Sequence, residues 1–194
     1  DKNTAKYLNS PESEIYHKSK VVYGIFQAKR EISKTEKCYL VEGYTDVMAA
    51  HLAGISTAVA TCGTAFGDEH IRIIRRLLMD ADAFRGEVIF TFDGDAAGIR
   101  ASLRGIDLIL EQGMNVKVCT FPEGEDPDSF AKKNSLDELK SYLKANAKDF
   151  IAYKASLLME EAQNDPVAKA NLIRDMVSSI SKVSDNIQRE IYVR

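Results

Sequence analysis

The sequence predicts an α/β fold, in which a mostly parallel sheet is flanked by helices and followed by a C-terminal helical bundle. Short apolar runs alternate with helical patterns between residues 37 and 121. Alternation of this kind indicates parallel strands that are joined by right-handed crossovers. After residue 128 only helical patterns remain. A chain of 194 residues, 45% of them hydrophobic, can form one such domain and a smaller helical unit.

The alternating part follows a polar N-terminal stretch and one amphipathic helix, which we expect at residues 21–32. We expect four strands, at residues 38–41, 57–62, 88–92 and 116–121. The helices between them should occupy residues 46–53, 68–79 and 99–110. We infer the strand order 2-1-3-4, because this order places the ends of strands one and three side by side.

The C-terminal part begins with a capping box, Ser135 to Glu138, which predicts the start of a helix. Further helices are expected at 147–163, from Asp165-Pro166 to residue 183, and from residue 184 onward. The predicted organisation is therefore an N-terminal segment (1–36) left from a preceding subdomain, an α/β metal-binding domain (37–128) and a helical subdomain (129–194).

The charge distribution is uneven. The net charge is −3, which argues against bulk electrostatic capture of nucleic acid, although residues 1–36 carry a net charge of +2. No apolar run approaches the length of a membrane span, and no signal peptide opens the chain, so we expect a cytoplasmic protein without membrane contact. Cys38, Cys62 and Cys119 should be buried, reduced thiols. We interpret the chain as a fragment of a larger protein.

The third predicted strand runs directly into Asp93-Gly94-Asp95. A calcium loop would require an oxygen ligand at Ala97 and a glutamate at Arg104, so the sequence excludes it. A haloacid-dehalogenase-type phosphatase would not have two alanines after the second aspartate. The remaining alternative to a metal site is a solvated turn with helix-capping aspartates.

Carboxylates follow three of the four predicted strands. Because the C-terminal ends of parallel strands meet at one edge of the sheet, we expect these side chains to form a site for Mg²⁺ or Mn²⁺. The expected ligands are Glu42, Asp93, Asp95, Asp126 and Asp128. Asp128 could instead be the N-cap of a helix that starts at Ser129. Asp46 could simply compensate a helix dipole in the first turn.

Five acids at a sheet edge can support metal-assisted phosphoryl transfer, in which two ions bind the attacking and leaving oxygens. We expect Asp93 and Asp95 to be the principal ligands and Glu42 to be a ligand or a proton acceptor. These three residues are the predicted catalytic residues.

Three collinear motifs carry a family resemblance: residues 41–47, residues 92–98, and Gly124-Glu125-Asp126-Pro127-Asp128. They resemble the TOPRIM module of primases, topoisomerases and some nucleases. The last motif, together with residues 6–12 and Lys18, is similar to bacterial DnaG-type DNA primases. The resemblance covers about residues 6–130.

The resemblance implies synthesis of short RNA primers on single-stranded DNA from ribonucleoside triphosphates, with Mg²⁺ or Mn²⁺. It implies that the five acids are the metal ligands. It also implies nucleotide or template contacts by four residues, Lys6, Asn9, Lys18 and Asp46, although solvated lysines remain an alternative. The implied partners in the primosome are a replicative helicase and a single-strand-binding protein, which would be contacted by parts of the protein outside this chain. A zinc ribbon would likewise lie outside this chain, in an N-terminal part.

Two alternatives remain open at this point. A TOPRIM topoisomerase or nuclease would cleave preformed nucleic acid without nucleoside triphosphates. A non-catalytic TOPRIM module would bind nucleic acid without a functional metal site.

Overall fold

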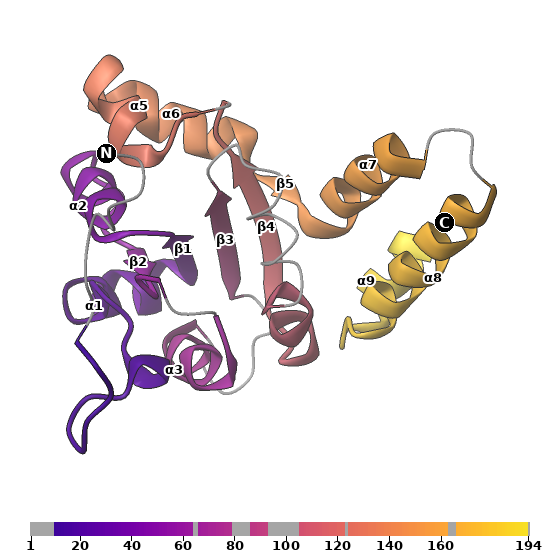
Figure 1. Cartoon of the computed structure of the whole chain (residues 1–194), viewed down its shortest axis with the longest axis horizontal. Helices are drawn as coiled ribbons and strands as arrows, with labels where there is room; N and C mark the ends of the chain where they lie inside the picture. The colour runs from indigo at the N-terminus through magenta and orange to yellow at the C-terminus, as the bar shows by residue number, and fades with distance from the viewer. Residues whose placement is uncertain are drawn as a thin grey trace.

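The computed structural model describes residues 10–63, 66–78, 86–92, 105–122, 124–162 and 166–193. A five-stranded sheet runs through the molecule (Figure 1), with the strand order β2-β1-β3-β4-β5. The strands are β1 (Lys37–Val41), β2 (Ala58–Ala60), β3 (Glu87–Phe92), β4 (Asn115–Thr120) and β5 (Lys148–Asp149). The first four are parallel, and β5 joins the edge of β4 antiparallel. The structure therefore confirms the inferred strand order 2-1-3-4.

Side chains alternate between the two faces of this sheet, because successive residues of a strand point to opposite sides. One face buries Leu40, Phe90 and Val118, which lie next to one another in the strand register. On this face pack α1 (Ile25–Thr35), α3 (Asp68–Leu78) and the helical residues 105–111. The other face carries Ile89 and is covered by α2 (Tyr44–Leu52) and α6 (Leu136–Asn146).

The remaining helices are η1 (Lys18–Lys20), α5 (Pro127–Lys133), α7 (Phe150–Ala162), α8 (Pro166–Ser181) and α9 (Asn186–Val193). The helices α7 to α9 lie beside β4 and β5 in Figure 1. Phe150 and Val183 belong to the same buried cluster as the sheet residues, so the C-terminal helices share the core of the sheet. The expected boundary at residue 128 stays a prediction.

Three local features differ from the sequence-based expectations. The first helix begins at Ile25, because Tyr23 pairs with Ala60 and Gly24 adopts a φ of 81° ahead of it. A Cβ on Gly24 would lie 2.9 Å from the Val47 side chain, so the tight entry requires glycine. The segment after residue 128 is not purely helical, since β5 lies within it. Finally, α5 begins at Pro127, before the expected start at Ser129.

The three cysteines are buried and form no disulfide among the described residues. Burial raises the pKa of both the Cys38 and the Cys119 thiols to about 12. These thiols therefore remain protonated and behave as core side chains, because the reactive form of cysteine is the thiolate. Among the described residues, no helix is both long and apolar enough to cross a bilayer.

Candidate metal-binding site

Three of the acids expected at the sheet edge, Glu42, Asp126 and Asp128, lie within the described residues. Glu42 follows directly after β1 and is exposed. Strands β1 and β3 are hydrogen-bonded neighbours, and β4 lies on the other side of β3. Asp93 and Asp95, which follow β3 in the sequence, lie outside the described residues. Asp126 and Asp128 lie at the start of α5, which packs against α2, the helix that follows Glu42.

Asp46 lies in the first turn of α2 and is 5% exposed. Its Oδ2 atom accepts a hydrogen bond of 2.9 Å from the Gly43 backbone N–H, which caps the start of the helix. A Cβ on Gly43 would lie only 3.1 Å from Oδ2, so glycine permits this close approach. The other oxygen, Oδ1, is buried without a hydrogen-bond partner in the described part of the chain.

Asp126 is the N-cap of α5 and is held there by Ser129 in a reciprocal pair of hydrogen bonds. The Asp126 N–H donates to Ser129 Oγ over 2.8 Å, and the Ser129 N–H donates to the Asp126 carboxylate. The expected N-cap role of Asp128 is therefore wrong. Asp128 lies one residue inside the helix and pairs with Lys132 over 2.7 Å. Proline in the first position of α5 leaves Asp126 as the flanking residue.

The two helix starts face each other, because α2 packs against α5. The pKa of Asp46 is raised to about 6, mainly by burial and secondly by the negative charge of Asp126. The backbone N–H groups of Gly43 and Asp128 oppose this effect and lower the pKa. The surroundings of Asp46 therefore disfavour its ionised form, and a cation bound nearby would favour that form.

The donor set suits a hard divalent cation, because Mg²⁺ and Mn²⁺ prefer carboxylate oxygens. The buried Oδ1 atom of Asp46 offers one such oxygen that no described donor satisfies. Within the described ranges, however, no three histidine, cysteine or acidic side chains converge to form a complete metal site. A full ligand set would thus have to include residues outside those ranges, such as Asp93 and Asp95.

The expected nucleotide and template contacts are placed only in part. Lys6 and Asn9 lie outside the described residues. Lys18 is half-buried in η1, and its carbonyl oxygen lies 3.2 Å from Nε2 of the buried His70. The Gly67 N–H donates to Nδ1 of the same ring, so Nε2 carries the proton and donates to Lys18. His70 thus fixes η1 against α3.

Ser129 and Glu125 support this site, although the sequence analysis gave neither residue a role in it. Ser129 also donates to Glu125 over 2.7 Å, and Glu125 forms an ion pair with Lys133. The ion pair and these hydrogen bonds lower the pKa of Glu125. The spacing from Asp126 to Ser129 is that of a capping box with serine in the last position, so the sequence did contain a signal for Ser129.

Comparison with known proteins places the chain in a family. Residues 39–131 match the family described as Toprim-like, and residues 1–29 match the N-terminal domain of the DNA primase catalytic core. The DNA primase of Mycobacterium leprae is 43% identical over all of this chain, which spans 30% of that protein. The chain therefore spans about a third of the length of such curated relatives.

Solved structures agree with this placement. The RNA polymerase domain of Mycobacterium tuberculosis primase DnaG matches the whole chain with a TM-score of 0.82 and 41% identity, and the chain covers 61% of it. A DnaG primase catalytic domain bound to single-stranded DNA matches 98% of the chain with a TM-score of 0.80 and 30% identity, and 60% of that domain is covered. The chain belongs to the DnaG-type DNA primase family and corresponds to part of its catalytic core.

Proposed function

We propose that this chain contributes the acidic metal centre of a primase, which synthesises short RNA primers on single-stranded DNA and releases pyrophosphate. The observation that carries the proposal is Asp46, a buried carboxylate with an unpartnered oxygen beside Asp126. A protein that did not bind a cation here would gain stability from a neutral side chain at this position. The 43% identity to a DNA primase over the whole chain supports the same reaction.

The ligands in this proposal are Glu42, Asp93, Asp95, Asp126 and Asp128, and the ion is Mg²⁺ or Mn²⁺. When bound, such ions lower the pKa of the attacking hydroxyl and neutralise charge on the triphosphate. The chain's own residues hold the site in place. Ser129 fixes the Asp126 carboxylate, and Gly43 orients Asp46. Glu42, which is exposed at the end of β1, is proposed as a ligand or as the acceptor of the 3′-hydroxyl proton.

The proposed substrates are ribonucleoside triphosphates and a single-stranded DNA template. Lys6, Asn9, Lys18 and Asp46 are the proposed nucleotide or template contacts. A solved relative was captured with single-stranded DNA, which supports this choice of template. In the bacterial cytoplasm, a replicative helicase and a single-strand-binding protein would be the partners, reached through other parts of the full-length protein.

The test is Glu42→Gln in the full-length protein. Glutamine keeps the size and the hydrogen-bonding reach of glutamate but removes the charge. If Glu42 binds a metal ion or accepts a proton, ribonucleotide incorporation should fall by a factor on the order of 10² or more. Single-stranded DNA binding should hardly change, because phosphate contacts come from basic residues elsewhere. Glu190→Gln is the matched control, since Glu190 is an exposed glutamate on α9.

A melting curve of each variant checks that the fold is intact. Full incorporation by a folded Glu42→Gln protein would contradict the proposed role of Glu42. Equal losses of template affinity and incorporation would contradict it as well. Metal-dependent cleavage of nucleic acid without ribonucleoside triphosphates, together with no incorporation by the wild type, would favour a nuclease instead.

A further inference from the structure

A cavity of about 400 Å³ opens on the sheet face that α6 covers, at the edge where β1 and β3 begin. Lys37 and Glu87 are the first residues of these two strands and line the cavity. The acidic residues follow the other ends of the strands. At about 3.3 Å per residue, the five residues of β1 separate the two regions by roughly 15 Å. The cavity is therefore distinct from the candidate metal site.

The lining carries a surplus of positive charge. Four lysines and two glutamates face the cavity, whereas the whole chain carries a net charge of −3. Both glutamates are already engaged. Glu87 pairs with Lys37 over 3.5 Å and with Lys117 over 2.7 Å. Glu31 pairs with Lys34 over 3.4 Å. Among the described lining residues, the lysines without an acidic partner are Lys140 and Lys144.

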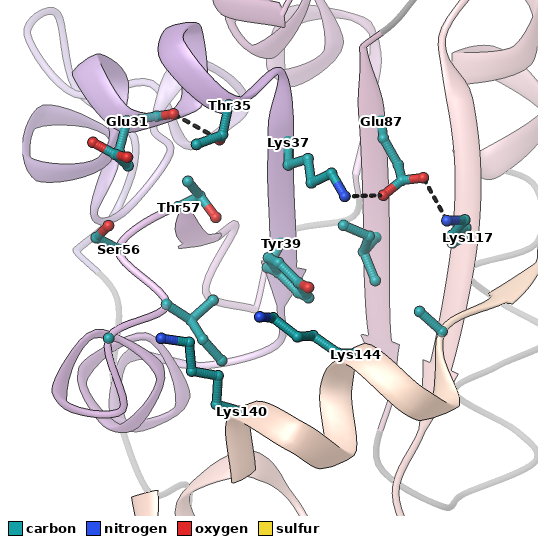
Figure 2. A pocket seen from close by; sticks show the side chains of 14 residues that line it. Glu31, Thr35, Lys37, Tyr39, Ser56, Thr57, Glu87, Lys117, Lys140 and Lys144 are labelled. Atoms are coloured by element: carbon teal, nitrogen blue, oxygen red, sulfur yellow. Dashed lines mark hydrogen bonds and ion pairs between the residues drawn. The ribbon is translucent and has the colours of Figure 1, made fainter. Parts of the chain in front are cut away.

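These two lysines are presented to the cavity by the way α6 packs. Leu139 and Leu143, one turn apart, are buried against the sheet, so Lys140 and Lys144 form the adjacent stripe of the helix. Figure 2 shows both lysine side chains extending from α6 toward Tyr39 and Ser56. Two ammonium groups on neighbouring turns of one helix can both bind the same anionic group.

The rest of the cavity suits an organic body attached to that anion. The Tyr39 ring lies in the middle of the cavity (Figure 2), and Ile55 and Ile89 add apolar surface. Ser56 and Thr57 bring hydroxyl groups to the side opposite β3. The volume lies within the range of small-molecule sites, which combine apolar walls with a few polar groups. A phosphate monoester carries a charge of about −1.5 to −2 at pH 7, which matches the two free lysines.

We propose that this cavity binds a small phosphate monoester of mononucleotide size, with its phosphate held by Lys140 and Lys144. The organic part lies against Tyr39, and its hydroxyl groups reach Ser56 and Thr57. A nucleoside monophosphate and a sugar phosphate share this chemistry. This site does not depend on the proposed primase activity, because it uses none of the acids at the opposite edge.

The experiment is calorimetric titration of the full-length protein in a chelating buffer, which prevents metal-bridged binding at the acids. The three probes are adenosine 5′-monophosphate, ribose 5-phosphate and inorganic phosphate. We expect adenosine 5′-monophosphate to bind, and Lys140→Gln and Lys144→Gln each to weaken it by on the order of tenfold, as for a lost charge-assisted hydrogen bond. Arginine at both positions should retain binding. Lys169→Gln, an exposed lysine on α8, is the matched control and should leave binding unchanged.

The probes also separate the two sources of the phosphate. Tighter binding of adenosine 5′-monophosphate than of ribose 5-phosphate, lost in Tyr39→Leu, would identify a nucleotide stacked on the ring. Equal binding of both would identify a sugar phosphate. The proposal is overturned if the folded double glutamine variant binds like the wild type, or if none of the probes binds at millimolar concentration. It is also overturned if the lysine variants weaken only the binding of an oligonucleotide.

Discussion

At the scale of single residues, two opposing effects act on the protonation of the Asp46 carboxylate. Burial and the charge of Asp126 favour its protonated form, whereas a cation bound beside it would favour the ionised form. The hydrogen bond from Gly43 stabilises the charged form only in part. Without a cation, Asp46 therefore reduces the stability of the fold at neutral pH, as is typical of functional sites.

We predict that this conflict is visible in the pH dependence of folding without metal. The pKa of Asp46 is raised from 3.8 to about 6 in the folded chain. Between these values the unfolded chain has released its proton while the folded chain retains it. The free energy of unfolding should therefore fall as the pH rises from about 4 to 6, by up to roughly 3 kcal/mol. The loss should level off above pH 6.

The measurement is urea unfolding in chelating buffer between pH 4 and 7.5. Asp46→Asn has no proton to release at this position, so its stability relative to the wild type should improve across this window. Asp137→Asn, an exposed acid in the first turn of α6, controls for the removal of a negative charge. Parallel curves for the wild type and Asp46→Asn would show that Asp46 does not titrate in this range.

The sequence pointed to the acids at the strand ends but not to the burial of Asp46. Acids after β1 and β4 follow from strand patterns alone, because the order of a parallel sheet brings their ends together. Asp46 looked like an ordinary acid in the first turn of a helix. Its burial depends on the packing of α2 against α5, two helices that lie more than 70 residues apart in the sequence.

At the scale of elements, α5 shows how one residue can serve both the fold and the site. Asp126 caps the helix, and its carboxylate also faces Asp46. The sequence contained the signal for this cap, since proline favours the first helical position directly after the N-cap. In contrast, β5 has only two residues, too few for any periodic pattern, and its position depends on the free edge of β4.

Two substitutions of Asp126 should separate its two roles. Asparagine caps helices about as well as aspartate, and it removes the like charge beside Asp46, so Asp126→Asn should leave metal-free stability unchanged or slightly higher. Asp126→Ala should cost about 1 kcal/mol, because Ser129 loses its capping partner. Both variants should lose most of the increase in melting temperature that Mn²⁺ gives the wild type, since binding to the native state stabilises it.

Thermal melting with chelator and with Mn²⁺ measures both effects on the same samples. Ser135→Ala removes the cap of α6, which lies away from the acids, and is the matched control for a lost cap. It should lower metal-free stability but keep the Mn²⁺ shift. An undiminished Mn²⁺ shift in Asp126→Asn would place the ion elsewhere.

At the scale of the whole molecule, a buried polar network connects the C-terminal helices to the rest of the fold. Lys154 on α7 donates to Ser179 Oγ on α8 over 2.7 Å, and Ser179 donates to Asp107 over 2.9 Å. Lys182 pairs with the same aspartate over 3.1 Å. Ser179 is fully buried, and Lys154 is 8% exposed. The sequence showed no chemical signature in these helices, because none of these residues is close to its partners along the chain.

We predict that Ser179→Ala destabilises the sheet and the C-terminal helices together. The substitution leaves the buried Lys154 ammonium without its hydrogen-bond partner and removes one of the hydrogen bonds of Asp107, which should cost roughly 1–3 kcal/mol. Hydrogen exchange should show faster opening of amides in both β4 and α8, because both contribute to one core. Ser181→Ala, an exposed serine on α8, is the control and should change little. Faster exchange in α8 alone would indicate that the helices form an independent unit.

The distribution of charge over the whole chain leads to the last prediction. Binding of single-stranded DNA depends on lysines and arginines that displace counterions from phosphates, whereas this chain carries a net charge of −3. It also covers only 61% of the M. tuberculosis RNA polymerase domain. The isolated chain should therefore bind single-stranded DNA weakly, with a shallow dependence on salt, even where Mn²⁺ raises its melting temperature. The full-length protein should bind more tightly. The slope of its log affinity against log salt concentration should be steeper by about 0.7 for each additional phosphate contact.

Fluorescence anisotropy with a labelled oligonucleotide at several salt concentrations measures the slope for each protein. Equal affinity and equal slopes for the two proteins would show that the template is held by this chain itself, and Lys18 on η1 would then be the first residue to substitute.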